Sequence, residues 1–279
     1  MGKYAMIRDG LRARGILPAG GLAEPDPAPV DTLALVHTAE YIASVLDGTL
    51  DERSARRLGF PWRPELPERS RRTVQGTLEA ARDALDSGAG ASLAGGTHHA
   101  YPGHGEGFCV FNDVAVAVRA LRRERAVSRV AILDLDVHQG NGTAAIFADD
   151  PDVFTFSMHG ANNYPFRKER SRLDVALPDG CGDAEYLAVL AARLDDVLAE
   201  SRPGLAFYIA GADPYGGDRL GRLGLSIDGL ARRDRLVFAA CGRRGIPVAV
   251  VLGGGYARDL ADVVTIHANT VALLFGRHG

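Results

Sequence analysis

The segment DLDVHQGNGT, residues 134–143, brings carboxylates, an imidazole and an amide together directly after the apolar residues 130–133. An apolar run of this kind is typical of a buried strand, so the polar side chains lie where that strand should end. Isolated buried charges are costly unless they are paired or bound to a metal. The segment therefore needs a partner, which other parts of the chain must supply.

A metal ion is one such partner. Asp136 and His138 are two residues apart, so on an extended segment their side chains point the same way. Asp213 follows another apolar run and could supply a third ligand. One imidazole and two carboxylates leave an open position, which is typical of a catalytic zinc site. A solvated Asp or a hydrogen-bonded His explains any one of these residues alone, but the three together favour metal binding.

The adjacent pair His98-His99 suits acid–base chemistry. Near a bound metal, an imidazole with a pKa close to neutral is the natural general base for the metal's water. Each imidazole needs an orienting partner on its other nitrogen. Asp134 and Asn141 flank the expected metal ligands and could serve, which gives the whole segment a chemical purpose.

Aromatic and glycine residues complete the candidate site. Tyr256 follows three glycines, with Gly254 at their centre, and such glycines let the backbone approach a ligand closely. A phenol placed there could hydrogen-bond a developing oxyanion. Gly107-Phe108 and Tyr164 could line an apolar channel, although either aromatic alone is more typical of a core residue.

Short apolar runs predict buried strands, and longer stretches with helical spacing separate them. This alternation predicts an α/β fold in which helices cover both faces of a parallel sheet. The clusters GGTHHA, DVHQGNG, SMHG, GADPYGGD and GGGY each lie at or just after a predicted strand. Ligands of open parallel sheets bind outside the carboxyl ends of the strands, so the clusters predict one site at that edge. The predicted strands are Ala91–Ala94, Val130–Leu135, Val153–Ser157, Leu205–Ala210 and Pro247–Leu252, and the predicted helices are Arg72–Asp86, Val114–Glu124, Ala184–Glu200, Gly229–Cys241 and Asp259–Phe275.

The bulk properties indicate an ordinary globular protein. No repeat or long linker divides residues 1–279, so we expect one domain, with Gly48–Ser70 as a long surface loop. The net charge of −3 and the pI near 6.2 give no general attraction to nucleic acid or anionic membranes. We expect no secretory signal, and no apolar run is long enough to span a membrane. The three cysteines lack CxxC spacing and fit free thiols in the cytoplasm.

The motifs GGTHHA, GEGFCVFND, DLDVHQGNGT, GADPYGGDRLG and GGGY occur in the order found in the zinc-dependent histone deacetylase superfamily. The chain resembles that superfamily from about Val36 to its C-terminal helix. The resemblance implies a single-domain arginase/deacetylase-like fold and removal of acyl groups from the ε-amine of lysine in a peptide or protein. The segments HQGNG and NNYP look most similar to class IV deacetylases and their bacterial relatives.

The resemblance also implies roles for individual residues. Asp136, His138 and Asp213 would bind Zn²⁺. His99 would act as general base and then acid, with His98 as an electrostatic helper. Asp134 would orient His98, Asn141 would orient His99, and Tyr256 would donate a hydrogen bond to the oxyanion. Potassium would bind at Asp134, Asp136, His138, Ser157 and Met158, and the substrate would contact Gly107, Phe108, Tyr164 and Gly254.

Two departures from the family bear on the pocket. Relatives usually carry an N-terminal strand and an active-site loop ahead of the region that matches Gly2–Gly15, so we expect either a truncated sequence or a protein without that strand. Many relatives place an Asp near LGFP to clamp the substrate backbone, whereas Phe60-Pro61 stand here. We therefore expect weak dependence on the peptide sequence around the acyl-lysine.

Other functions remain open at this point. An acetylpolyamine or other small acyl-amine deacylase would need the same zinc chemistry. A two-manganese arginase fits less well because DLDVHQGNG does not resemble Asp-rich manganese motifs. A non-catalytic binder of acyl-lysine would be expected to lack some of these groups, and a haloacid-dehalogenase-type phosphatase needs no histidine pair. The sequence does not distinguish a monomer from a homo-oligomer.

Overall fold

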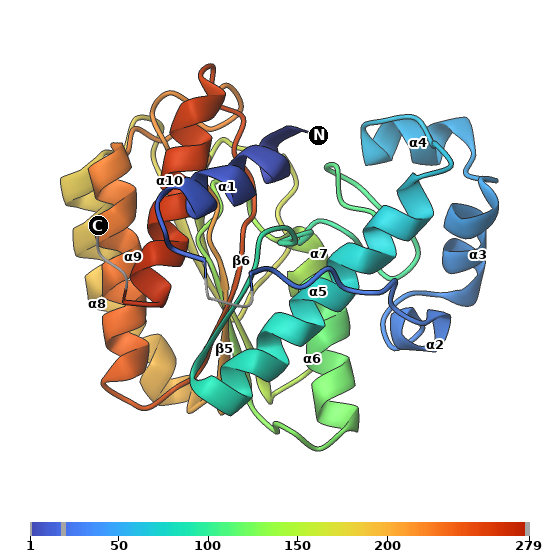
Figure 1. Cartoon of the computed structure of the whole chain (residues 1–279), viewed down its shortest axis with the longest axis horizontal. Helices are drawn as coiled ribbons and strands as arrows, with labels where there is room; N and C mark the ends of the chain where they lie inside the picture. The colour runs from blue at the N-terminus through green and yellow to red at the C-terminus, as the bar shows by residue number, and fades with distance from the viewer. Residues whose placement is uncertain (1, 18–20, 277–279) are drawn as a thin grey trace.

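Six parallel strands form one sheet in the computed structural model, which describes residues 2–17 and 21–276 (Figure 1). Their order across the sheet is β1-β6-β5-β2-β3-β4. β1 lies at one edge of the sheet. β2, β3 and β4 continue in order to the opposite edge, and β5 and β6 lie between β1 and β2. The strands are β1 (Ala89–Ser92), β2 (Val130–Asp134), β3 (Val153–Gly160), β4 (Leu173–Leu177), β5 (Leu205–Ile209) and β6 (Val248–Val251).

The strand order reverses between β2 and β5, which pair in register from Val130↔Leu205 to Asp134↔Ile209. At such a reversal the connections leave the sheet toward opposite faces, so a crevice opens outside the carboxyl ends of the two strands. DVHQGNG follows β2 and GADPYGGD follows β5, so the fold brings these two segments to the same crevice.

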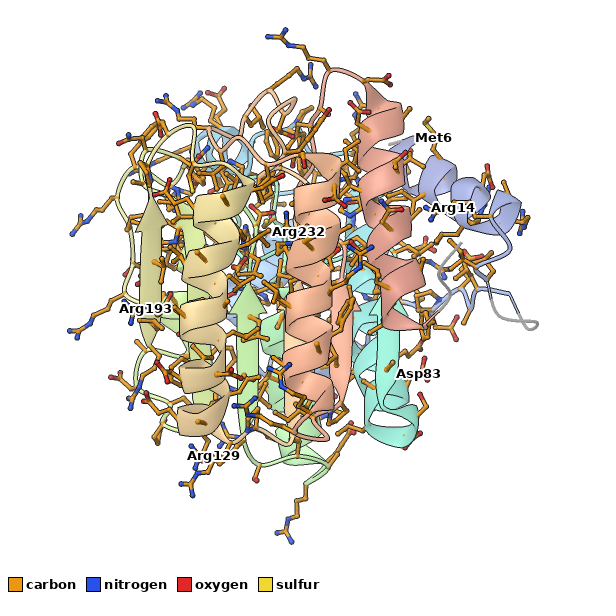
Figure 2. The ribbon with its side chains drawn as sticks, turned by 90° about the vertical axis from the view of Figure 1, so that its left-hand side faces the viewer. Met6, Arg14, Asp83, Arg129, Arg193 and Arg232 are labelled. Carbon is orange, nitrogen blue, oxygen red and sulfur yellow. The ribbon has the colours of Figure 1, made fainter. Side chains whose placement is uncertain are left out.

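Two apolar layers enclose the sheet because the side chains of each central strand alternate between its faces. Ala131 and Leu133 belong to the layer under α8, α9 and α10, whereas Val130 and Ile132 belong to the layer under α5 and α6. Figure 2 shows α8, α9 and α10 side by side over the first face. These helices are α5 (Leu66–Ser87), α6 (Asp113–Arg123), α8 (Asp183–Ser201), α9 (Ile227–Gly242) and α10 (Leu260–Leu274).

Shorter helices flank this framework. The N-terminal helix α1 (Gly2–Ala13) packs against α10. The helices α2 (Val30–Leu33), α3 (Ala39–Asp47) and α4 (Glu52–Leu58) lie beyond α5, away from the sheet (Figure 1). A third apolar cluster packs them against α5 and the segment before α6. The short helix α7 (Asn141–Ile146) follows β2 directly. No helix within residues 2–17 and 21–276 is long and apolar enough to cross a membrane.

The structure confirms the predicted α/β fold with helices on both faces of a parallel sheet. Each predicted strand and helix overlaps an observed one, but β4 and the shorter helices α1, α2, α3, α4 and α7 were not predicted. Because β4 pairs with residues 156–160, β3 continues to Gly160 rather than ending at Ser157. The prediction that Gly48–Ser70 forms one loop was wrong. It contains α4, which Asp51 caps by accepting from the Ser54 amide, and the first turn of α5.

A buried carboxylate fixes the segment that carries the histidine pair. Asp113, the first residue of α6, accepts hydrogen bonds from the backbone amides of Gly96 (3.0 Å) and Thr97 (2.7 Å). It also accepts from the hydroxyls of Thr97 and Thr77, each at 2.6 Å. Because Asp113 is fully buried, these donors have no water to replace it. The carboxylate therefore ties the end of β1, and His98 after it, to α5 and α6.

We predict that Asp113→Ala lowers the free energy of unfolding by about 3 kcal/mol or more, because it leaves several buried donors without an acceptor. Urea denaturation would measure the loss. The exposed Asp149 provides a control, and Asp149→Ala should change stability by less than about 0.5 kcal/mol. Equal stability of the two variants would show that the Asp113 bonds do not secure this segment.

Candidate active site

Asp136, His138 and Asp213 meet at the crevice between β2 and β5. Each of the three offers one ligand atom, and these atoms all lie within 4.8 Å of one another. His138 Nδ1 is 2.9 Å from Asp136 Oδ1 and 3.3 Å from Asp213 Oδ2. All three side chains are buried. This is a compact set of one nitrogen and two oxygen donors.

The cluster fits a divalent cation. Asp136 Oδ2 accepts from the Gly254 amide at 2.8 Å and Asp213 Oδ1 accepts from the Val137 amide at 2.9 Å. Asp213 Oδ2, in contrast, is buried without a hydrogen-bond partner. Burial and the neighbouring Asp136 raise the pKa of Asp213 to about 6, which reflects the cost of placing two carboxylates together. A cation bound by His138 and both carboxylates would remove that cost.

Backbone contacts hold the ligand loops from both sides. The fully buried Arg233 of α9 donates from Nη1 to the carbonyls of Leu135 (3.3 Å) and Gly211 (2.7 Å). Leu135 directly precedes Asp136, and Gly211 lies just before Asp213. One guanidinium therefore links the two loops that carry these ligands. On the other side, a Cβ on Gly254 would overlap Asp213 Oδ2, so only glycine allows this close approach.

The two histidines after β1 each bind an orienting partner. His98 Nδ1 donates to Asp134 Oδ2 and His99 Nδ1 donates to Asn141 Oδ1, both at 2.6 Å. The two rings are 4.2 Å apart, and the His99 ring is 5.9 Å from that of His138. With Nδ1 engaged, Nε2 is the remaining nitrogen of each dyad ring.

The different partners separate the pKa values of the two rings. Burial would lower the pKa of His98, but the charge and hydrogen bond of Asp134 raise it to about 9. Burial lowers the pKa of His99 well below its ordinary value, and the neighbouring His98 and His138 lower it further, because Asn141 is neutral. Near neutral pH, His98 therefore carries a proton on both nitrogens, whereas Nε2 of His99 stays unprotonated and can act as a base.

Tyr256 lies close to Phe108, with ring centroids 6.1 Å apart. Burial raises the pKa of its phenol, and the nearby Asp213 raises it further, so the hydroxyl keeps its proton and remains a donor. Lys3 of α1 approaches the same place: its Nζ is 3.4 Å from the Gly253 carbonyl and 5.7 Å from the Tyr256 ring centroid. The N-terminal helix thus covers the glycine segment that carries Tyr256.

A cavity of about 370 Å³ opens over the cluster. The candidate substrate contacts Gly107, Phe108, Tyr164 and Gly254 all line it, together with the three candidate ligands, both histidines and Tyr256. Phe108 has φ 66°, which is uncommon for a residue with a side chain, and its ring stacks on Phe60 at 6.3 Å. The Tyr164 ring is 5.0 Å from that of His99 on the other wall. A narrow substrate arm would pass between these aromatics to the cluster.

The predicted residues Ser157 and Met158 are not among those that line the cavity. Asp134 pairs in register with Ser157, and Met158 is the next residue of β3. Ser157 and Met158 are both buried, and the Ser157 hydroxyl lies 3.0 Å from His159 Nδ1. Potassium binding at this place stays a prediction.

Sequence reasoning missed several residues of the site. Arg57 and Arg222 line the cavity, Arg233 joins the ligand loops, and Glu106 contacts Asn141. Glu106 lies inside the motif GEGFC, but a sequence pattern does not tell which way an isolated carboxylate faces. The arginines occur among many others, so their types and spacing carry no signal.

The sequence and the fold of the chain are similar to those of known proteins. The family described as "Histone deacetylase domain" matches residues 1–271. An uncharacterised protein of Picosynechococcus is 45% identical, with 96% of this chain and 89% of that protein covered. Histone deacetylase 2 of Arabidopsis thaliana is 31% identical over 94% of this chain and 70% of its own length. A mouse polyamine deacetylase, HDAC10, is 32% identical over 94% of this chain and 43% of its own length.

Solved structures share the fold. The crystal structure of an HDAC homologue complexed with SAHA covers 99% of this chain and 77% of that one, with a TM-score of 0.84 and 23% identity. The HD domain of HDA15 covers 99% of this chain and 82% of that one, with a TM-score of 0.83 and 24% identity. The predicted arginase/deacetylase-like fold class is confirmed by these neighbours and by the parallel sheet.

We predict that Zn²⁺ at about 100 times its Kd adds about 2.7 kcal/mol to the stability of the metal-free protein, a rise in Tm of about 5 °C or more. Metal analysis should find one ion per chain, and a chelator should reverse the shift. His138→Ala should abolish the shift because it removes one of three ligands. The half-buried His104 provides the control, since His104→Ala leaves the cluster intact. A full shift in His138→Ala would exclude this cluster.

Proposed function

The chain belongs to the histone deacetylase family, and from that premise we propose that it is a zinc-dependent hydrolase that removes acetyl or longer acyl groups from the ε-amine of lysine in a peptide or protein. The observation that carries the proposal is the convergence of a three-ligand cluster, a histidine pair and a tyrosine on one cavity.

In this proposal Asp136, His138 and Asp213 hold the zinc, which when bound polarises the amide carbonyl and acidifies a water. The buried carboxylates supply the charge that retains the ion. The aromatic walls at Phe108 and Tyr164 exclude bulk water from the amide and guide the aliphatic lysine arm inward. Potassium bound beside Asp134 and Ser157 is part of the same proposal.

The two histidines have different roles in the proposed reaction. His99 offers a free Nε2 because Nδ1 donates to Asn141, so His99 accepts the proton of the attacking water. His98 is held in its charged form by Asp134 and favours the build-up of negative charge at the reacting carbonyl. Once protonated, His99 returns the proton to the departing lysine amine.

Tyr256 supplies the remaining stabilisation. Its protonated phenol donates a hydrogen bond to the oxygen that becomes negative when the carbonyl is attacked.

The charge around the cavity favours acyl-lysine over an acylated polyamine. Within the described residues, the only carboxylates that line the cavity are Asp136 and Asp213, which the ion would neutralise. Arg57 and Arg222 line it as well, and Arg222 is paired with Asp179 at 3.2 Å. An acylpolyamine keeps cationic amines, which these guanidinium groups would repel. An acyl-lysine within a peptide need not carry such a charge.

Hydrolysis of acyl-lysine peptides and acylpolyamines by the zinc-loaded protein tests the proposal. Turnover of acyl-lysine, with His99→Ala as the blank, is the expected result. Preference for acylpolyamines would favour the function named for the mouse relative. Binding without turnover would indicate a non-catalytic binder of acyl-lysine.

We predict that Tyr256→Phe lowers kcat by about 10²–10³-fold, because it removes one donor to the oxyanion. Zinc content and Tm should stay unchanged, which separates loss of chemistry from loss of the site. Tyr215, whose hydroxyl donates to Asp262 outside the cavity, provides a matched control. Full turnover in Tyr256→Phe would contradict the assigned role.

We predict that Arg57→Glu raises kcat/KM for an acetylpolyamine by about two- to fivefold relative to a neutral acetyl-lysine peptide, as expected for an exposed charge. The gain should shrink as salt is added, because salt screens exposed charges. Arg53→Glu, on the same helix but away from the cavity lining, is the control. If both variants behave alike, net charge rather than the cavity mouth sets the preference.

A further inference from the structure

Asn141 is bound on both ends of its side-chain amide. Its Oδ1 accepts from His99 Nδ1 at 2.6 Å, and its Nδ2 donates to Glu106 Oε1, also at 2.6 Å. The three side chains form one chain of hydrogen bonds that starts at a carboxylate and ends at the candidate base. The carboxylate comes from the GEGFC segment, far from Asn141 in the sequence.

An amide alone does not fix the state of His99. Rotated by half a turn, Asn141 would offer Nδ2 to His99, and His99 would then have to accept on Nδ1 and carry its proton on Nε2. In that tautomer the ring presents no base toward the cavity. An ionised carboxylate only accepts hydrogen bonds, so a carboxylate next to Asn141 allows one amide orientation and hence one tautomer.

The surroundings of Glu106 keep it ionised. Oε1 also accepts from the Tyr164 hydroxyl at 2.7 Å, and Oε2 lies 3.7 Å from His104 Nε2. Burial alone would raise the pKa of Glu106, but the nearby His104 and the hydrogen bonds from Tyr164 and Asn141 lower it to about 2. Glu106 Oε1 thus contacts both Asn141, whose amide orients His99, and Tyr164, which forms an aromatic wall of the cavity.

We propose that Glu106 is a positioning residue that fixes the amide orientation of Asn141 and thereby leaves Nε2 of His99 free to act as the base. The proposal rests on the proposed acyl hydrolysis for its kinetic consequences. The hydrogen-bond chain itself does not depend on the substrate.

Exchanging the two groups along the chain tests this inference. Asn141→Asp places two carboxylates in contact, so one must take up a proton or move away, and kcat should fall by about 10- to 100-fold, as for the loss of an orienting partner. Glu106→Gln can still accept a hydrogen bond from Asn141, so its kcat should fall less than that of Asn141→Asp.

The double variant Glu106→Gln/Asn141→Asp restores a donor–acceptor pair in the reverse order. The new amide at position 106 can donate to the new carboxylate at position 141, and that carboxylate still accepts from His99 Nδ1. The carboxylate at position 141 also raises the pKa of His99, so kcat is compared at a pH high enough to keep His99 deprotonated in both variants. At that pH the double variant should be about tenfold more active than Asn141→Asp alone.

A second pair of variants separates positioning from packing. Glu106→Leu removes the acceptor and should lower kcat by about 10- to 100-fold with little change in KM. Glu169→Leu removes a carboxylate that accepts from the Tyr101 hydroxyl at 3.1 Å rather than from Asn141, and this variant should keep kcat. A double variant no more active than Asn141→Asp, or a Glu106→Leu enzyme with full kcat, would overturn the proposal.

The tautomer of His99 can also be observed directly, without measuring catalysis. In protein labelled with ¹⁵N-histidine, His99 should show a strongly hydrogen-bonded Nδ1 proton, identified by its loss in His99→Ala. In Glu106→Leu this proton should shift or broaden as the amide populates both orientations. An unchanged signal refutes the inference. If the parent protein hydrolyses no acyl-amine but the signal changes as expected, the proposed function fails and the positioning role stands.

Discussion

Two carboxylates buried side by side set the main constraint on this molecule. Asp136 and Asp213 are almost fully excluded from water, and such a pair is costly without compensating charge or hydrogen bonds. The protein meets part of the cost with the Gly254 and Val137 amides and leaves Asp213 Oδ2 without a hydrogen bond. The reversal of strand order between β2 and β5 brings the two residues together. The contacts of Arg233 with the Leu135 and Gly211 carbonyls keep the two loops together.

The histidine pair shows how one site obtains two different imidazoles from nearly the same environment. Both rings are buried and both donate from Nδ1 at the same distance. His98 donates to a carboxylate and is stabilised as a cation, whereas His99 donates to an amide and is not. Titratable groups whose environments push their pKa values apart are typical of acid–base pairs. The division depends on Asn141 being neutral, so its amide must be held in one orientation by a group outside the pair.

The sequence predicted the centre of the fold better than its edges, for physical reasons. β2, β5 and β6 are buried on both faces and are therefore continuous apolar runs, so their ends marked the polar clusters that meet at the crevice. β4 lies at the edge and is mostly half-buried, so its apolar signal is weak. Glu106 and Arg233 act through contacts between distant segments. Neither spacing nor composition reports such contacts, which only the folded chain brings about.

Chemistry and selectivity are carried by different layers of the structure. The candidate ligands and histidines follow strands of the sheet, whose packing leaves little freedom. The cavity mouth depends instead on α4, because the amides of Gly107 and Phe108 donate to the carbonyls of Arg57 and Leu58 at its C-terminal end. These two bonds hold Phe108 in its positive-φ conformation against Phe60. A change in α4 would therefore reshape the mouth without moving the cluster. Sequence reasoning took this segment for a loop. The sequence motifs therefore indicated the reaction more clearly than the substrate.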